Sequence, residues 1–309
     1  MKKIISVILP CFNEAKNISP LVAEIIKKIP SRYEYEIICI DDGSFDQTKN
    51  EIEKLSMHNK DIKGILFYSR FGHQQALRAG IDYSKGDAVI MMDADFQHPP
   101  KLIPEFIGKW EKGYDLVRAK KIQNKGVGIF RNIGNKIAYR LWSIVSNGVI
   151  IPGVSDFRLI SREIANYVKQ SHEENLFVRG IVNLVAKKPC NIFYKIGKRK
   201  YGKSSYSNGD LLELFINGFI SFSTKPLRTA FVLGIILFAF TGLFLFVDLV
   251  QALIMGRKII EGWLTTIYLT FLANSLILIY LGVLGEYMGV IFRETKKRPY
   301  YFIDKTINL

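Results

Sequence analysis

Two carboxylates separated by one residue, Asp93 and Asp95, directly follow the apolar run Ala88–Met92. If that run is a buried strand, the i, i+2 spacing turns both side chains to the same side of the strand end. Hard oxygen ligands of this kind suit Mg²⁺ or Mn²⁺, which keep coordination positions open for diphosphate oxygens. Gln97 offers a third oxygen, whereas His98 is interpreted as a loop residue. A bare Asp-x-Asp is common, but at a strand end it predicts a metal site that serves a diphosphate leaving group.

Polar groups also follow the first two apolar runs of the chain. The run Ile4–Leu9 leads into residues 10–14 (PCFNE), and the run Glu36–Ile40 leads into residues 41–44 (DDGS). Carboxylates and amides at such places accept hydrogen bonds from a nucleobase or from ribose hydroxyls. Ordinary turn chemistry is the alternative, because Asp-Gly and Asn are common loop formers.

These three loops need a scaffold that brings their strand ends together. Over about the first 120 residues, short β-branched runs alternate with amphipathic stretches, which favours a parallel sheet covered on both faces. Ligand sites in such sheets lie at the carboxyl ends of the strands. We expect strands at Ile4–Leu9, Glu36–Ile40, Ile62–Tyr68 and Ala88–Met92. Between the first two strands we expect one helix, whose start signals are Ser19 and Pro20. Two further helices are expected over Thr48–Met57 and His73–Tyr83.

The rest of the first 205 residues is less regular, and from about residue 126 only a helix over Asn132–Val145 is expected. The sequence has no G-x-G-x-x-G after its first strand and no P-loop motif, which disfavours dehydrogenases and P-loop enzymes. Its three cysteines, Cys11, Cys39 and Cys190, lie far apart and predict neither a disulfide framework nor a zinc site.

The chain is strongly basic, with 43 Lys and Arg against 28 Asp and Glu and a formal net charge of +15. Such a balance fits three acidic partners: nucleic acid, anionic lipid, or a substrate that carries phosphate. The excess charge clusters near two long apolar runs, so nucleic acid is the least expected of the three.

The two apolar runs are Ala230–Val247, with 18 uncharged residues, and Gly262–Gly285, with 24. A bilayer core of ~30 Å needs about 20 apolar residues in a helix, so both runs can span it. Two long buried core helices are the alternative, but apolar residues surround each run instead of forming one stripe. We therefore expect two transmembrane helices.

Cations beside the runs predict the orientation. Lys225 and Arg228 precede the first run, a basic cluster at 293–298 follows the second, and the short connecting loop has only Arg257 and Lys258. The positive-inside rule then places the catalytic region and both termini in the cytosol. The expected domains are a cytosolic catalytic domain at 1–205, an amphipathic juxtamembrane segment at 206–226, two transmembrane helices at 227–292 with an external loop at about 254–262, and a cytosolic tail at 293–309.

Four motifs occur together in an order that resembles family 2 glycosyltransferases. They are Pro10-x-x-Asn13-Glu14, Asp41-Asp42-Gly43-Ser44, Asp93-Ala94-Asp95-x-Gln97-x-Pro99 and Asp156-Phe157-Arg158. More narrowly, the chain resembles the polyprenyl-phosphate hexosyltransferases, the group of dolichol-phosphate mannose synthase and the bactoprenol glucosyltransferases. The resemblance implies an α/β catalytic domain of the GT-A (Rossmann-like) type, a nucleotide-sugar donor, a divalent metal (Mg²⁺ or Mn²⁺) and inversion at the anomeric carbon.

The resemblance also implies roles for single residues. The nucleotide-sugar contacts are Pro10, Asn13, Glu14, Asp41, Asp42, Asp93 and Asp95, and the metal ligands are Asp93, Asp95 and Gln97. Arg118, at the end of the fifth strand, and Arg131 resemble arginines that hold the lipid phosphate. Lys200 and Lys203 lie in a basic loop that resembles a segment closing over the donor. That loop usually ends Ser-Lys-Tyr, whereas Ser205 here takes the place of the lysine, and a solvated basic surface facing anionic lipid is the alternative.

Asp156 matches a position often called the catalytic base, and Asp95 is the other carboxylate implied in catalysis. A phosphate monoester has a second pKa near ~6, so at neutral pH the acceptor is already mostly a dianion. The base role remains the leading interpretation of Asp156. An orienting role toward the acceptor, or a structural pairing with Arg158, is the alternative.

The leading prediction is transfer of a hexose from a UDP-sugar, by default UDP-glucose, to polyprenyl (undecaprenyl) phosphate for cell-envelope glycosylation. The enzyme would be a multi-pass protein of the plasma (inner) membrane, and a downstream flippase or glycosyltransferase would use its product. Glycines in the spans would permit close helix packing and a homo-oligomer. Two alternatives remain: a processive polysaccharide synthase, whose Gln-x-x-Arg-Trp motif is missing, and a non-catalytic membrane-tethered module that binds nucleotide or lipid phosphate. No residue decides the sugar.

Overall fold

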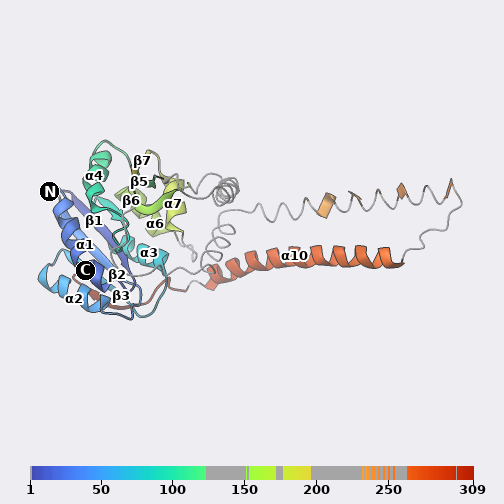
Figure 1. The fold of residues 1–309 in the computed structure, drawn as a ribbon, viewed down its shortest axis with the longest axis horizontal. Coiled ribbons are helices and arrows are strands. Elements are labelled where there is room, and N and C mark those ends of the chain that lie inside the picture. Colours follow the sequence, from blue (N-terminus) through green and yellow to red (C-terminus); the bar gives the residue numbers. More distant parts are fainter. Residues whose placement is uncertain are drawn as a thin grey trace. The chain divides into compact units, whose positions relative to one another are not determined.

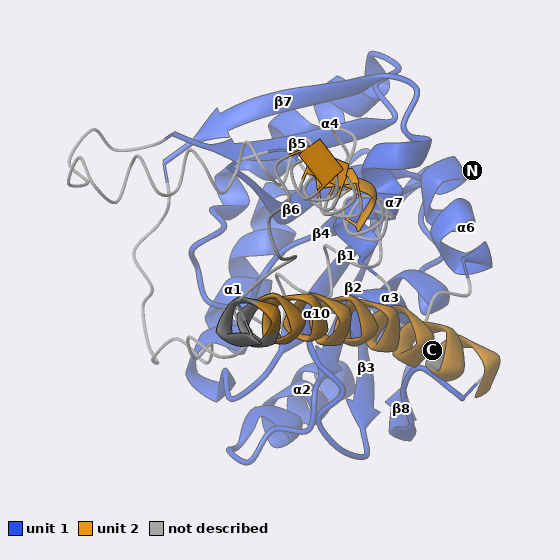
Figure 2. Cartoon of the chain, turned by 90° about the vertical axis from the view of Figure 1, so that its right-hand side faces the viewer, with its two compact units in different colours: residues 1–210, 298–309 blue, residues 211–297 orange. Residues whose placement is uncertain are grey.

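The computed structural model describes residues 2–122, 151, 153–171, 177–195, 263–296 and 298–309, and scattered positions between 232 and 254. The chain forms two compact units, Met1–Asp210 with Arg298–Leu309 and Leu211–Lys297 (Figure 2). Several predictions fall outside the described residues: the helix over Asn132–Val145, the segment 206–226, and the site residues Arg131, Lys200 and Lys203.

The first unit is built on an eight-stranded sheet with the order β7-β5-β6-β4-β1-β2-β3-β8 (Figure 1 and Figure 2). The strands are β1 (Ile4–Cys11), β2 (Glu34–Asp41), β3 (Ile62–Phe67), β4 (Ala88–Met91), β5 (Leu116–Lys121), β6 (Val154–Ser161), β7 (Pro189–Tyr194) and β8 (Ile303–Ile307). The four predicted strands, β1 to β4, are confirmed and run parallel. The sheet as a whole is mixed, because β6 runs antiparallel to both β4 and β5, and β8 runs antiparallel to β3.

Helices connect and cover these strands. They are α1 (Ala15–Lys28), α2 (Thr48–His58), α3 (His73–Tyr83), the 3-10 turn η1 (Pro100–Leu102), α4 (Ile103–Glu111), α6 (Arg162–Gln170) and α7 (Val178–Val185). The predicted start of α1 at Ser19 and Pro20 is wrong. The carbonyl of Glu14 already accepts N–H bonds from Asn17 and Ile18, so the helix begins at Ala15. Pro20 lies inside the helix on its exposed side, where its missing N–H removes a single ladder bond.

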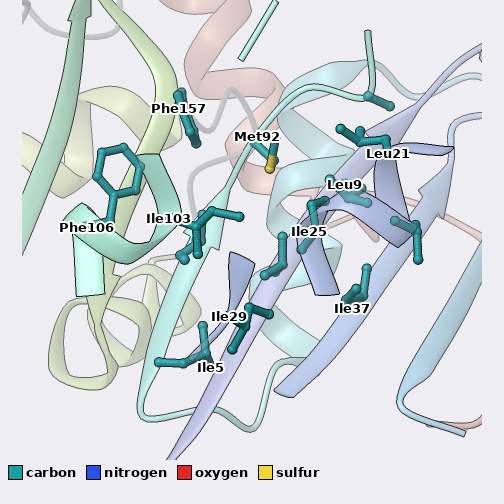
Figure 3. Packing of buried hydrophobic residues seen from close by; sticks show 14 of the residues in the cluster. Ile5, Leu9, Leu21, Ile25, Ile29, Ile37, Met92, Ile103, Phe106 and Phe157 are labelled. Atoms are coloured by element: carbon teal, nitrogen blue, oxygen red, sulfur yellow. The ribbon is translucent and has the colours of Figure 1, made fainter. Parts of the chain in front are cut away.

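Both faces of the sheet are covered, as predicted. On one face, Leu21 and Ile25 of α1 and Phe106 of α4 pack with Leu9 and Ile37 of the central strands (Figure 3). On the other face, α3, α6 and α7 pack over alternate residues of the same strands, such as Ile8. Burying each large aliphatic side chain contributes about 1.5–3 kcal/mol. These two layers hold the strand ends rigidly in register, which is what a site at the sheet edge requires.

The second unit contains the 34-residue helix α10 (Trp263–Lys296). Its part Leu269–Lys296 is long and apolar enough to cross a membrane, and it is the one such helix in the described part of the chain. The predicted second span, Gly262–Gly285, falls largely on α10. The predicted first span, Ala230–Val247, is described at scattered helical positions alone, so the presence of two spans stays a prediction.

The chain re-enters the first unit after α10. Residues 298–309, expected as a tail, include β8, whose Ile307 pairs with Gly64 of β3. The sequence analysis did not predict this strand.

Candidate active site

The polar loops singled out by the sequence meet at one edge of the sheet. In the parallel register Cys11 of β1 lies beside Asp41 of β2, and Ile8 of β1 lies beside Met91 of β4, so the loops after these strands leave from the same edge. β6 runs in the opposite direction, and its first residues, including Asp156, therefore come to that edge as well. The structure thus brings together the loops that carry residues 10–14, 41–44, 93–97 and 156.

The loop after β4 is tied together by its own side chains. Asp95 accepts two hydrogen bonds from Gln97, one from the backbone N–H at 3.0 Å and one from the side-chain amide at 2.7 Å. The buried ring of His98 accepts the N–H of Asp93 through Nδ1 at 2.9 Å and stacks on Phe157. Phe96 adopts a φ of 65°, an unusual conformation for an aromatic residue and one that tends to occur at functional sites. His98 thus acts as a support for the loop.

One oxygen in this loop fits a cation. Asp93 Oδ1 is buried and accepts no hydrogen bond in the described structure, with His73 Nε2 3.4 Å away. The described residues hold no cluster of three His, Cys, Asp or Glu that would by itself cage a metal. Mg²⁺ is commonly held by one or two carboxylates together with substrate phosphates. Asp93 and Asp95 fit that mode of binding. The side-chain amide nitrogen of Gln97 donates to Asp95, so Gln97 supports this carboxylate.

The loops after β1 and β2 hold each other. Asn13, in the left-handed region at φ 57°, donates its N–H to Ser44 Oγ and accepts the N–H of Phe45, both at 2.9 Å. Glu14 donates its N–H to Thr48 Oγ1 at 2.9 Å, and Pro10 lies within β1 opposite Ile40.

The two adjacent aspartates of the second loop have different partners. Asp42 accepts the N–H groups of Phe71 and Gly72 at 2.7 and 3.0 Å, so its carboxylate orders the loop after β3. Asp41 accepts the N–H of Ser44 at a long 3.4 Å, and burial raises the pKa of its carboxyl. Of the two, Asp41 has the weaker hydrogen bonds within the protein, so its carboxylate is the better placed to accept hydrogen bonds from a ligand.

Asp156 is buried in a group of cations. Arg179 of α7 donates Nε to one oxygen at 3.1 Å and Nη2 to the other at 2.6 Å, a bidentate pair. His73 Nε2 lies 3.6 Å from the same carboxylate and so links Asp156 to Asp93. Arg158 is more distant, at 3.7 Å, and donates a 2.7 Å bond to the carbonyl of Ser155.

These partners set the protonation states. Burial opposes the charge on Asp156, but Arg179 and His73 outweigh it, and the pKa of Asp156 lies well below its ordinary value. Burial likewise opposes the imidazolium of His73, but the carboxylates of Asp156 and Asp93 raise the pKa of that histidine to about 9. A carboxylate held so strongly in its ionised form is a weak proton acceptor.

The sequence analysis placed Arg118 at the end of the fifth strand. In the structure it is the third residue of β5 and does not lie at the strand end. Its buried guanidinium donates to Asn191 Oδ1 at 2.9 Å and to Asn183 Oδ1 at 3.2 Å. The sequence analysis missed His73 and Arg179. The position of His73 at the start of a helix that follows a strand was a usable signal, because such helix starts lie at the ligand edge. Arg179 lies in a stretch without clear periodicity and gave no signal.

Comparison with known proteins identifies the class of enzyme. Residues 6–168 match the family model of glycosyl transferase family 2. The chain is 34% identical over 305 residues to the glycosyltransferase YkcC of Bacillus subtilis (strain 168), covering 98% of this chain and 94% of that protein. It is 33% identical over 303 residues to the prophage bactoprenol glucosyl transferase homolog of Escherichia coli (strain K12), covering 97% and 98%. It is 34% identical over 304 residues to the bactoprenol glucosyl transferase of Shigella phage SfII, covering 98% of each. The chain belongs to glycosyl transferase family 2 and is a glycosyltransferase.

Solved structures agree on the fold. The chain is similar to glucosyl-3-phosphoglycerate synthase from Mycobacterium tuberculosis in complex with UDP, with a TM-score of 0.51 at 18% identity, over 71% of this chain and 79% of that one. For the complex of that enzyme with Mg²⁺ and UDP the TM-score is 0.50 at 18% identity, over 72% and 79%. The likeness extends to the fold alone, a mixed α/β sheet of the GT-A type.

Proposed function

We propose that this glycosyltransferase moves glucose, with inversion, from UDP-glucose to polyprenyl (undecaprenyl) phosphate at the cytosolic face of the plasma membrane. The observation that carries the proposal is the meeting of the nucleoside loops, the Asp93–Asp95 loop and Asp156 at one sheet edge. The acceptor is supported by the relatives called bactoprenol glucosyl transferases, which match nearly the full chain. The apolar helix α10 supports a site near the membrane.

On the donor side, Pro10, Asn13, Glu14 and Asp41 would surround the nucleoside, and Asp42 would fix the neighbouring loop. Asp93 and Asp95 would hold Mg²⁺ or Mn²⁺, for which the hydrogen-bond-free Oδ1 of Asp93 is the supporting observation. When bound, such a cation neutralises charge on the departing diphosphate. Gln97 would orient Asp95 through the two hydrogen bonds described above.

On the acceptor side, the lipid phosphate would be held by cations. Arg131, Lys200 and Lys203 keep this proposed role from the sequence, and Arg118 would take part through the side of β5 that faces α7. A multi-pass topology with both termini in the cytosol, a homo-oligomer, and a flippase or glycosyltransferase that uses the product belong to the same proposal.

For Asp156 the bidentate pair with Arg179 favours an orienting role over that of a base. The carboxylate would hold Arg179 and His73 in place, and the acceptor phosphate would attack as the dianion that it already is at neutral pH.

The test is transfer in membranes that contain the full chain, with undecaprenyl phosphate and a panel of radiolabelled UDP- and GDP-sugars. We expect one labelled glycolipid, formed from UDP-glucose and lost on addition of EDTA. The matched variant is Asp95→Asn, which removes one negative charge without changing volume and should lower kcat about 100-fold or more, equivalent to several kcal/mol of transition-state stabilisation. Its unfolding temperature should equal that of the wild type.

Three results would contradict the proposal. If label is transferred only from a nucleotide sugar other than UDP-glucose, the assignment of glucose as the transferred sugar is wrong. A glycolipid that carries more than one sugar would indicate a processive synthase. Full turnover by Asp95→Asn would remove the metal site from the Asp93–Asp95 loop.

A further inference from the structure

The chain segment that follows α10 packs against the loop at the donor side of the sheet. We call residues 300–307 the C-terminal strap and residues 68–72 the β3–α3 loop. The strap pairs along β3 from Gly64, opposite Ile307, to Phe67, opposite Ile303. Beyond the last pair, Tyr68 donates its N–H to the carbonyl of Phe302 at 3.0 Å. The strap therefore reaches past the strand and onto the loop.

Aromatic side chains extend this contact. The ring of Tyr301 stacks on Phe67 with centroids 5.1 Å apart and planes 14° apart, and its hydroxyl donates to Asp82 of α3 at 3.0 Å. The ring of Phe302 lies 5.9 Å from that of Phe71. Tyr301 and Phe302 thus contact the strand before the loop, the loop itself, and the helix after it.

The same loop supports the candidate donor site. Phe71 and Gly72 donate their N–H groups to Asp42, the aspartate that follows Asp41. The turn at residues 41–44 is in close contact with the β3–α3 loop, because a Cβ added to Gly43 would lie 2.7 Å from the backbone N of Arg70. The loop also leads into His73, which lies between Asp93 and Asp156. A displaced loop would therefore move groups on both sides of the site.

We propose that the C-terminal strap is a positioning element of the active site. Through Tyr301 and Phe302 it fixes the β3–α3 loop, and through that loop it fixes the turn at Asp42 and the imidazole of His73. The proposal rests on the proposed function, because it takes the turn at Asp42 as part of the donor site.

The strap provides its own control. Its distal half makes two exposed ion pairs, Asp304 with Lys49 at 2.8 Å and Lys305 with Glu53 at 2.9 Å, both with α2. These pairs hold the strap to the unit without contacting the β3–α3 loop. If the strap merely covered the edge of β3, removing the aromatic contacts or removing the ion pairs would change the donor KM and the order of the β3–α3 loop to a similar extent.

The test compares full-length variants in detergent. In Tyr301→Ala/Phe302→Ala we expect the donor KM to rise roughly tenfold, as for the loss of one or two weak contacts. Amide hydrogen exchange should increase in peptides covering 68–76. The control Asp304→Ala/Lys305→Ala should leave the donor KM and the exchange of 68–76 at wild-type values, and Phe302→Tyr should keep them too.

The exchange measurement separates this proposal from the proposed function. If UDP-glucose is not the donor, every variant and the wild type will be inactive with it, and exchange in 68–76 still decides the role of the strap. If the double variant does not fold, Tyr301→Phe, which loses only the bond to Asp82, takes its place in the exchange experiment. Unchanged exchange in 68–76 in Tyr301→Ala/Phe302→Ala (or in Tyr301→Phe, if that variant replaces it), or an equal change in the control Asp304→Ala/Lys305→Ala, would overturn the proposal.

Discussion

The acidic residues of the candidate site differ in what surrounds them. Asp156 accepts two hydrogen bonds from Arg179 and is also close to His73, so its charge is matched within the protein. Asp93 Oδ1 is buried and accepts no hydrogen bond among the described residues. The imidazole of His73, 3.4 Å from this oxygen, is shared with Asp156, so it offsets only part of the cost of burying a carboxylate oxygen without a donor, and a bound cation would offset more. Residue type alone does not distinguish the two roles, whereas the neighbouring groups do.

The buried pair of Glu36 and Lys63 predicts how stability depends on pH. Burial opposes the charge on Glu36, but hydrogen bonds from Lys63 at 2.5 Å and from Ser6 at 2.5 Å outweigh it, and the pKa of Glu36 is lowered from its ordinary value of 4.5. A lowered folded-state pKa means that the stabilisation is complete above pH 4.5 and is lost as pH falls through the folded-state pKa. The unfolding temperature of the wild type should therefore decrease over that acidic range.

Glu36→Gln should make this acidic decrease smaller, with the remainder due to other carboxylates of lowered folded-state pKa such as Asp156, and should also destabilise the protein at neutral pH. The loss should be about 3 kcal/mol, because Lys63 keeps a buried charge without its partner. Thermal unfolding in detergent from neutral pH to below pH 4.5 measures both effects. Glu163→Gln, which breaks an exposed pair with Lys187, is the control and should behave like the wild type. An acidic decrease of the same size in Glu36→Gln would refute the assignment.

At the scale of elements, the turn at 41–44 and the β3–α3 loop act as one structure. Gly43 has φ 69°, and an added Cβ would meet the backbone of both Ser69 and Arg70 at 2.7 Å. Backbone atoms cannot rotate away as a side chain does, so the two loops must separate if Gly43 is replaced.

Gly43→Ala should cost about 1–2 kcal/mol of stability for the positive φ and should also raise the donor KM. Gly113→Ala is the matched control, because Gly113 has φ 86° but nothing within 4 Å of its Cβ position. Both variants should lose stability, while the donor KM should change in Gly43→Ala alone. Equal donor KM values in the two variants would mean that the turn does not take part in donor binding.

The sequence predicted the elements whose signal is local. β1 to β4 are continuous apolar runs, which is the pattern of buried parallel strands, and α3 was predicted at its observed bounds, His73–Tyr83. β6 was missed because its interior includes Asp156 and Arg158, whose burial depends on partners far away in the sequence. β8 was missed because IDKTI is short and mostly exposed, as edge strands often are. The three loops at the sheet edge were predictable for the same reason as the strands, while Arg179 was not.

At the scale of the whole molecule, the sheet limits the path of the chain through a membrane. Residues before Asp210 and after Arg298 belong to the same unit, and β8 pairs with β3 within it. A chain that leaves this unit and returns to it must cross a membrane an even number of times. If α10 is one crossing, this favours a second one before it, at the predicted span Ala230–Val247.

Cysteine labelling tests this topology in intact cells. Lys258→Cys, in the predicted external loop, should react with a membrane-impermeant maleimide, and Thr306→Cys, exposed on β8, should react only after permeabilisation. Cys11 and Cys39 are buried, so replacing Cys190 by Ser should leave little background labelling by the maleimide. Labelling of both positions from outside, or of neither, would contradict two crossings with a cytosolic catalytic unit.

The place of β8 in the chain has a consequence for biosynthesis. A ribosome makes β3 early, but the strand that covers its open edge emerges only after α10. Until then β3 exposes unpaired N–H and C=O groups that can pair with another chain. Because domains tend to fold from the N-terminal side as they are synthesised, the rest of the sheet can form before β8 has been made. The loop beside Asp42 is then fixed only after the hydrophobic helix α10 has been made, so in the proposed membrane enzyme the insertion of α10 would precede the completion of the active site.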